Sequence, residues 1–189
     1  MRDIDIRESL KTGPLKKYVS DSDSLVLDEF NISLGIVRAD IAILNGVLHG
    51  IEIKSEKDTL KRLDTQLTEY KKFFEYITVV TCEKFQNKIE NSIPERCGIL
   101  VAKSENDKIV FKTVRKAKKN YDIDKICLAK SLWKEEIIDA LKEINYKKGL
   151  KSKSKPLLYE ILCDNFSKQE LLKIVKEKIK TRINWRAVE

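Results

Sequence analysis

The fold is decided by residues 38–54, which read RADIAILNGVLHGIEIK. Two short apolar runs are separated by Asn45-Gly46, a dipeptide that favours positive φ and tight hairpin turns. We therefore expect two antiparallel strands joined at this dipeptide. Side chains alternate between the two faces of a strand, so Glu52 and Lys54 share one face of the second strand.

Charged residues interrupt these otherwise apolar strands. Asp40 stands at the start of the first strand, next to a run of isoleucine, alanine and leucine. Burial of a charged group is unfavourable unless the group is paired or bound to a metal ion. The position of Asp40, Glu52 and Lys54 thus predicts either an internal ion pair or a functional site.

Composition sets limits on the class of protein. The chain has 189 residues, a formal net charge of +8 and no apolar run long enough to cross a membrane. The first residues are charged and resemble no signal peptide, and the four cysteines are widely spaced. We expect a cytoplasmic protein with reduced thiols and no membrane association. The positive charge favours an anionic partner, of which nucleic acid is the first candidate.

Hydrophobic periodicity predicts the remaining elements. The predicted helices cover residues 3–12, 58–76, 84–91, 131–145, 157–165 and 167–180, and the predicted strands outside the hairpin cover residues 25–32, 77–82, 98–102 and 108–114. Because strands and helices alternate up to residue 115, we expect an α/β fold with a mixed β-sheet core flanked by helices. Residues 116–189 are predicted to form a basic C-terminal helical extension of this core at residues 1–115.

The order strand, strand, strand, helix, strand over residues 25–82 resembles the PD-(D/E)XK nuclease superfamily, whose fold is called restriction-endonuclease-like. The residues that carry the resemblance are Asp40, the run Glu52-Ile53-Lys54, and the upstream acid Glu29. The run from Gln66 to Tyr70 is similar to a Q-x-x-x-Y helix motif of one branch, typical of small bacterial and phage members. Ala39 stands where the family motif has proline.

The pattern E-x-K alone is weak in a chain of which 36% is charged. It occurs again at Glu69-Tyr70-Lys71, on a predicted helix, where positions two apart do not face each other. Only the first occurrence lies on a predicted strand that follows an Asp-bearing strand.

The resemblance implies a metal-dependent nuclease that hydrolyses DNA phosphodiester bonds in repair, recombination or phage–host conflict. It implies Mg²⁺ or Mn²⁺ bound by Asp40, Glu52 and the carbonyl of Ile53, since such cations take oxygen ligands. Lys54 would stabilise developing charge. The resemblance gives the remaining catalytic roles to Glu29, Gln66 and Tyr70.

Each residue also has a structural interpretation. Asp40 and Lys54 are compatible with a cross-strand ion pair, and Asp28 rather than Glu29 is an alternative for the inward acid of its strand. Gln66 is compatible with a surface position on its helix, and Tyr70 with a position in the core.

The partner implied by the resemblance is DNA, with RNA not excluded and a homodimer left open. Phosphate contacts are expected from a lysine-rich loop, namely Lys147, Lys148, Lys151, Lys153 and Lys155, with Lys116, Lys118 and Lys119 as further candidates. The alternative interpretation of this loop is a solvated surface segment. Because resemblance of fold determines activity poorly, the alternative is a catalytically weak or inactive nuclease-fold module that binds nucleic acid or another partner.

Overall fold

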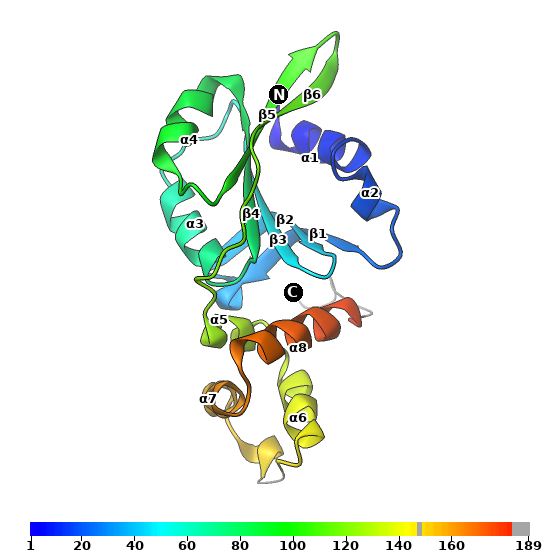
Figure 1. Cartoon of the computed structure of the whole chain (residues 1–189), viewed down its shortest axis with the longest axis vertical. Helices are drawn as coiled ribbons and strands as arrows, with labels where there is room; N and C mark the ends of the chain where they lie inside the picture. The colour runs from blue at the N-terminus through cyan, green and yellow to red at the C-terminus, as the bar shows by residue number, and fades with distance from the viewer. Residues whose placement is uncertain (147–148, 183–189) are drawn as a thin grey trace.

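The computed structural model describes residues 1–146 and 149–182. A six-stranded mixed sheet forms its centre, with the strands in the spatial order β1-β2-β3-β4-β5-β6 (Figure 1). The strands are β1 (Leu25–Ile32), β2 (Val37–Leu44), β3 (Leu48–Lys54), β4 (Tyr76–Cys82), β5 (Gly98–Glu105) and β6 (Lys108–Arg115). β3, β4 and β5 run parallel, whereas the β1–β2, β2–β3 and β5–β6 pairs are antiparallel.

Helices cover both faces of the sheet. On one face lie α1 (Asp3–Thr12) and α2 (Lys16–Val19), and α1 buries Ile6 and Leu10 against isoleucines of β2 and β3. On the other face lie α3 (Leu63–Lys71), the 3₁₀ turn η2 (Glu83–Phe85) and α4 (Gln86–Ser92). α3 and α4 are the crossovers that the parallel pairs β3–β4 and β4–β5 require.

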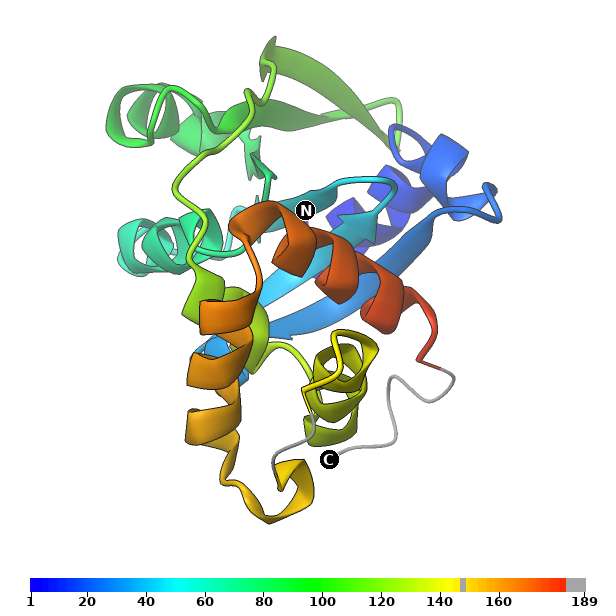
Figure 2. The same ribbon diagram turned by 60° about the horizontal axis from the view of Figure 1, so that its bottom comes forward.

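The chain continues into four helices at one end of the sheet (Figures 1 and 2). They are α5 (Lys125–Lys130), α6 (Lys134–Glu143), α7 (Lys155–Asn165) and α8 (Lys168–Lys180), and the short 3₁₀ turns η1 (Ser33–Gly35) and η3 (Leu150–Ser152) complete the described elements. One hydrophobic cluster runs from the sheet through α3 and α4 into α5–α8. Among the described helices, none combines the length and apolar content needed to cross a bilayer.

The predicted fold class is confirmed, since the chain is a mixed α/β sheet flanked by helices with further helices at the C-terminal end. The division at residue 115 stays a prediction. The hydrophobic cluster continues across it, although the secondary structure changes from strands to helices there.

Three local predictions differ from the structure. The helix expected over residues 58–76 is helical only over Leu63–Lys71, and α5 has no counterpart among the predicted elements. The predicted two-residue hairpin turn is a three-residue connection, since Leu44 pairs with Leu48 and only Gly46 within it has positive φ. All four cysteines are free thiols.

The alternation of β1 and β2 changes at one point, which places the polar residues of the site. Leu27 and Phe30 lie three residues apart, yet both belong to the same hydrophobic cluster, and so do Ala39 and Ala42. In a regular strand such pairs would point to opposite faces. The change occurs at Glu29, whose φ is 54°, and at Asp40, whose neighbours Ile41 and Ala39 pair with Asp28 and Phe30. Polar side chains therefore stand where two apolar strands switch faces.

Glu75 connects the C-terminal helix α8 to strand β3 of the sheet. Its carboxylate is 5% exposed, accepts a hydrogen bond from the backbone N–H of Leu48 (2.9 Å) and pairs with Lys176 of α8 (3.2 Å). We expect Glu75→Ala to lower the free energy of unfolding by about 1–3 kcal/mol, because it leaves the backbone N–H of Leu48 without an acceptor and Lys176 with only the carbonyl of Gly46. Urea unfolding measures this effect.

Glu177→Ala is the matched control. Its exposed carboxylate lies 3.9 Å from Lys173 on the same helix, so its loss should change stability by less than about 0.5 kcal/mol. Equal effects of the two substitutions would contradict the anchoring role of Glu75.

Candidate functional site

The centre of the site is the carboxylate of Glu52, which is 1% exposed. β3 directs Glu52 and Lys54 towards α3, because Ile51 and Ile53 pack on the opposite face beneath α1. α3 supplies Gln66 and Tyr70, which are four residues apart and so lie on one side of the helix. The fold thus brings four predicted site residues together from two neighbouring elements.

Every oxygen of Glu52 accepts a hydrogen bond. Lys54 Nζ and Gln66 Nε2 each donate to Oε1 at 2.6 Å, and the hydroxyl of Tyr70 donates to Oε2. Lys54 also donates to Gln66 Oε1 at 2.9 Å. Burial, with the charge and hydrogen bond of Glu52, raises the pKa of Tyr70 well above its usual range, so its phenol remains a proton donor. The network neutralises and satisfies its buried carboxylate within the protein.

Asp40 lies next to this network on β2. Its Oδ2 accepts a hydrogen bond from the backbone N–H of Ile53 at 2.6 Å. Burial, followed by the nearby charge of Glu52, raises the pKa of Asp40 to about 7. Asp40 therefore changes charge close to neutral pH.

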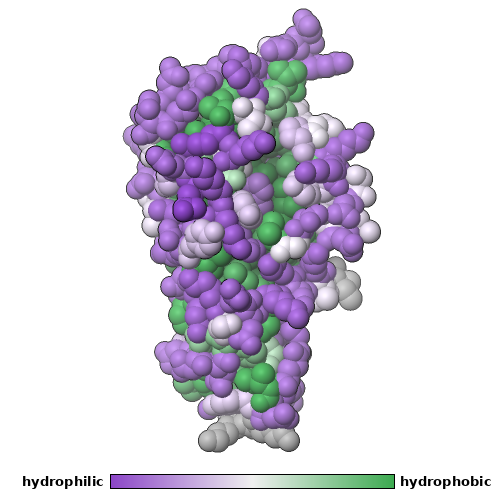
Figure 3. All heavy atoms as spheres, in the orientation of Figure 1, coloured by the Kyte–Doolittle hydropathy of each residue, from purple (hydrophilic) through white to green (hydrophobic). Residues whose placement is uncertain are grey.

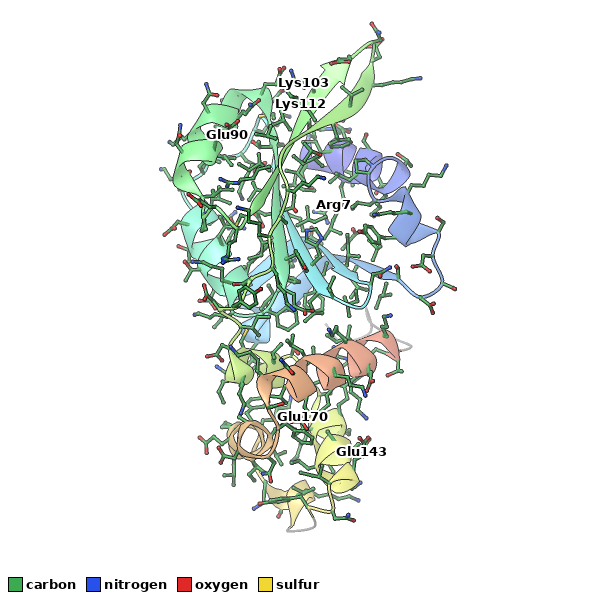
Figure 4. The ribbon with its side chains drawn as sticks, in the orientation of Figure 1. Arg7, Glu90, Lys103, Lys112, Glu143 and Glu170 are labelled. Carbon is green, nitrogen blue, oxygen red and sulfur yellow. The ribbon has the colours of Figure 1, made fainter. Side chains whose placement is uncertain are left out.

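Arg7 is a member of the site that sequence reasoning missed. Its guanidinium lies in the space between α1 and the sheet (Figure 4), with 7% of the side chain exposed. It contacts four carboxylates, at 2.5 Å from Glu29, 3.1 Å from Asp3, 3.5 Å from Asp40 and 4.0 Å from Asp28. The only sequence signal was the i,i+4 spacing of Asp3 and Arg7, which does not indicate the acids of β1 and β2.

The two acids of β1 have different partners. Glu29, the predicted upstream acid, binds Arg7 and also Arg38 at 2.6 Å. Asp28 is held by Lys11 of α1 at 2.6 Å. Glu29 therefore belongs to the cluster around Arg7, whereas no contact joins it to Glu52.

The predicted lysine loop lies apart from these groups. Lys151 and Lys155 are exposed and Lys153 is half-buried, all at or beside η3 at the far end of the helical region (Figure 1). Lys147 and Lys148 lie outside the described residues. The predicted phosphate contacts of this loop stay a prediction.

The oxygen donors predicted to bind Mg²⁺ or Mn²⁺ are of the right chemical type. However, both oxygens of Glu52 already accept hydrogen bonds from protein groups. Among the residues that the structure describes, no three His, Cys, Asp or Glu side chains form a group that could hold a metal ion. A cation bound by Asp40, Glu52 and the carbonyl of Ile53 thus requires rearrangement of this network, and it stays a prediction.

The geometry defines a mixed α/β protein with a closed, internally neutralised polar centre. The chain belongs to the bacteriophage P4 protein cII family, whose sequence profile matches residues 12–187. Protein cII of Enterobacteria phage P4 is 31% identical over 161 residues, which are 85% of this chain and 60% of that protein. This chain therefore spans about three fifths of the length of that relative.

A solved structure of a protein of unknown function from Silicibacter pomeroyi is also similar. It is 16% identical, with a TM-score of 0.42, and the match covers 74% of this chain and 90% of that chain.

Family membership corrects the function predicted from the sequence. The prediction of a metal-dependent nuclease that hydrolyses DNA in repair or recombination is wrong, because the chain belongs to the family of phage P4 protein cII, which is not a nuclease family. The association with phage agrees with the family. The physical reason for the error is that Lys54, Gln66 and Tyr70 satisfy Glu52, so the pattern of acids and lysine requires no metal ion or phosphate for its stability.

The raised pKa of Asp40 predicts a pH dependence of stability. Because the folded pKa of about 7 exceeds the ordinary 3.8, the stability that Asp40 contributes is complete below about pH 4 and is lost as pH rises through 7. Relative to Asp40→Asn, wild type should lose about 2 kcal/mol of unfolding free energy between pH 5.5 and 8. Urea unfolding at both pH values measures this difference.

His49 provides the control. Burial lowers its pKa to about 4, so stability from His49 is lost as pH falls, the opposite direction. His49→Gln should retain the fall in stability towards pH 8 that Asp40→Asn removes. An unchanged pH profile in Asp40→Asn would contradict the assignment.

Arg7 should stabilise the packing of α1 on the sheet. Arg7→Gln removes the ion pairs to Asp3, Glu29 and Asp40, so it should lower the free energy of unfolding by about 1–3 kcal/mol. Urea unfolding of wild type and variant measures this loss.

Arg2→Gln is the matched control on the same helix, since the exposed Arg2 binds only Asp5 among the described side chains. Its free energy of unfolding should stay within about 0.5 kcal/mol of wild type. Equal losses in the two variants would contradict the role of Arg7 between α1 and the sheet.

Proposed function

We propose that this chain is a DNA-binding phage protein of the cII family that holds DNA without cleaving it. The observation that carries the proposal is the distribution of charge. Each ion pair in the interior, such as Lys54–Glu52 or Lys176–Glu75, contains one positive and one negative group and has no net charge. These pairs therefore do not account for the net charge of +8. The excess of positive charge therefore lies on exposed segments.

The surface supports this proposal. On the face shown in Figure 3, hydrophilic residues cover most of the molecule, and hydrophobic residues appear between them in scattered places. Exposed lysines and arginines bind nucleic acid by neutralising phosphates and releasing counterions. Exposed cations on the chain after β6 and at η3, for example Lys118 and Lys151, are of the kind that makes such contacts.

We also propose that the sheet with α3 is related in fold to the PD-(D/E)XK superfamily. Support comes from the antiparallel β1–β2–β3 unit followed by α3 and the parallel strand β4. The convergence of Glu52, Lys54, Gln66 and Tyr70 gives further support. This kinship concerns the fold, because one fold hosts many functions.

Fluorescence anisotropy with a labelled DNA duplex tests the proposed function. We expect binding in EDTA, since the exposed cations need no metal ion. With about three phosphate contacts, affinity should fall about 40-fold between 50 and 200 mM salt. Single-stranded DNA and an RNA duplex of the same sequence show which nucleic acid is preferred.

Denaturing gels of the same samples, incubated with Mg²⁺ or Mn²⁺, test the absence of cleavage. We expect intact DNA at all times. Absence of duplex binding at 50 mM salt would overturn DNA binding, and cleavage products that disappear in Asp40→Ala would overturn the non-cleaving role.

A further inference from the structure

A small cavity of about 190 Å³ lies where the chain leaves the sheet for the C-terminal helices. Three separate segments line it, namely the end of α3 at Lys71, the loop before β5 at Arg96, and the linker after β6 at Lys118. This linker passes the start of β4 and β5 on its way to α5 (Figure 1). Residues distant in the sequence thus contribute three cations to one cavity.

Hydrogen bonds fix these segments relative to one another. The backbone N–H of Lys118 donates to the carbonyl of Arg96 at 2.9 Å, and Arg96 Nη1 donates to the carbonyl of Lys119 at 3.0 Å. The side-chain amide of Asn120, which is 5% exposed, donates to the carbonyls of Lys71 (2.6 Å) and Phe74 (2.8 Å). The cations are therefore presented by an ordered frame rather than by a free loop.

The charge of this cavity is not neutralised internally. Within residues 1–146 and 149–182, no ion pair joins Lys71, Arg96 or Lys118 to a carboxylate, although Glu95 and Asp122 also line the cavity. Burial raises the pKa of the Cys97 thiol to about 11, so this lining group carries no negative charge at neutral pH. The cavity is lined by three cationic and two acidic side chains, so its lining has a net positive charge that one more anionic group would neutralise.

The size of the cavity limits the anion. At about 30 Å³ for each water, 190 Å³ holds about six waters, enough for a phosphate group with part of its hydration. Exposed Lys116 and Lys119 extend the positive surface along the linker on either side of Lys118. This arrangement suits a phosphate that belongs to a chain of phosphates.

We propose that Lys71, Arg96 and Lys118 form a binding site for a backbone phosphate of DNA. The proposal rests on the DNA-binding function proposed above and gives it a location. Arg96 offers a planar donor fork, held by the ring of Tyr121 at 5.3 Å, and the two lysines supply point charges. Backbone contacts of this kind position DNA without reading its sequence.

The test compares two double variants that remove the same charge. Arg96→Gln with Lys118→Gln should lower duplex affinity at 100 mM salt about tenfold or more, and should reduce the slope of log K against log salt by about 1, because the site neutralises one phosphate. Lys108→Gln with Lys112→Gln removes two exposed cations from β6, away from the cavity, and should leave the slope close to wild type.

Two single variants separate binding from folding. Lys118 makes no side-chain hydrogen bond or ion pair among the described residues, so Lys118→Gln should keep the wild-type melting temperature and still lower duplex affinity at 100 mM salt. Arg96→Lys keeps the charge and should bind DNA more tightly than Arg96→Gln.

The outcomes distinguish the two proposals. Equal salt slopes in the two double variants, with DNA binding by wild type, would overturn this site and leave the proposed function intact. Absence of DNA binding by wild type would overturn both. A loss of slope confined to the Arg96/Lys118 variant supports the site.

Discussion

The buried carboxylate of Glu52 is the constraint on which the arrangement of this protein depends. A carboxylate that is 1% exposed must receive a hydrogen bond at each oxygen and a nearby positive charge, or burial costs several kcal/mol. Lys54 on the same strand and Gln66 and Tyr70 on α3 meet that requirement. The network therefore fixes how α3 lies across β3, more specifically than apolar packing alone.

A second charged cluster ties the opposite layer to the sheet. Arg7 of α1 reaches Glu29 and Asp40 at the point where β1 and β2 switch faces. Positive φ is unfavourable for a glutamate by about 1–2 kcal/mol, so the two arginines that bind Glu29 help to hold a strained position. Ile53 links both clusters, because its N–H binds Asp40 while its neighbours Glu52 and Lys54 lie in the other network. Contacts between charged groups thus help to determine the position of a helix on each face of the sheet, α3 on one face and α1 on the other.

The sequence predicted the helices and strands better than the contacts between side chains of different elements. Strand and helix periodicity located the six strands and most helices, and the capping box at Ser167 and Glu170 located α8, because these signals are local. The six-residue helix α5 is too short for a clear period. The contacts of Arg7 with β1 and β2 span more than twenty residues of chain and follow no local pattern. Gln66 and Tyr70 were placed beside Glu52 only through the resemblance, since helical spacing says nothing about which strand a helix covers.

The same limit explains why the predicted activity was wrong while the predicted grouping of residues has a counterpart in the structure. A sequence shows that acids and a lysine occupy apolar strands, but it does not show whether their partners are protein donors or a bound ligand. In this chain the donors of Lys54, Gln66 and Tyr70 complete the centre, whereas Lys71, Arg96 and Lys118 line one cavity and form no ion pair with a carboxylate in the part of the chain that the structure describes. Charged groups that are paired inside the fold contribute to its stability. Charged groups that are unpaired at the surface are available to attract a partner of opposite charge. By this criterion the DNA contact that we propose belongs to the segment where the chain leaves the sheet, not to the polar centre between β3 and α3.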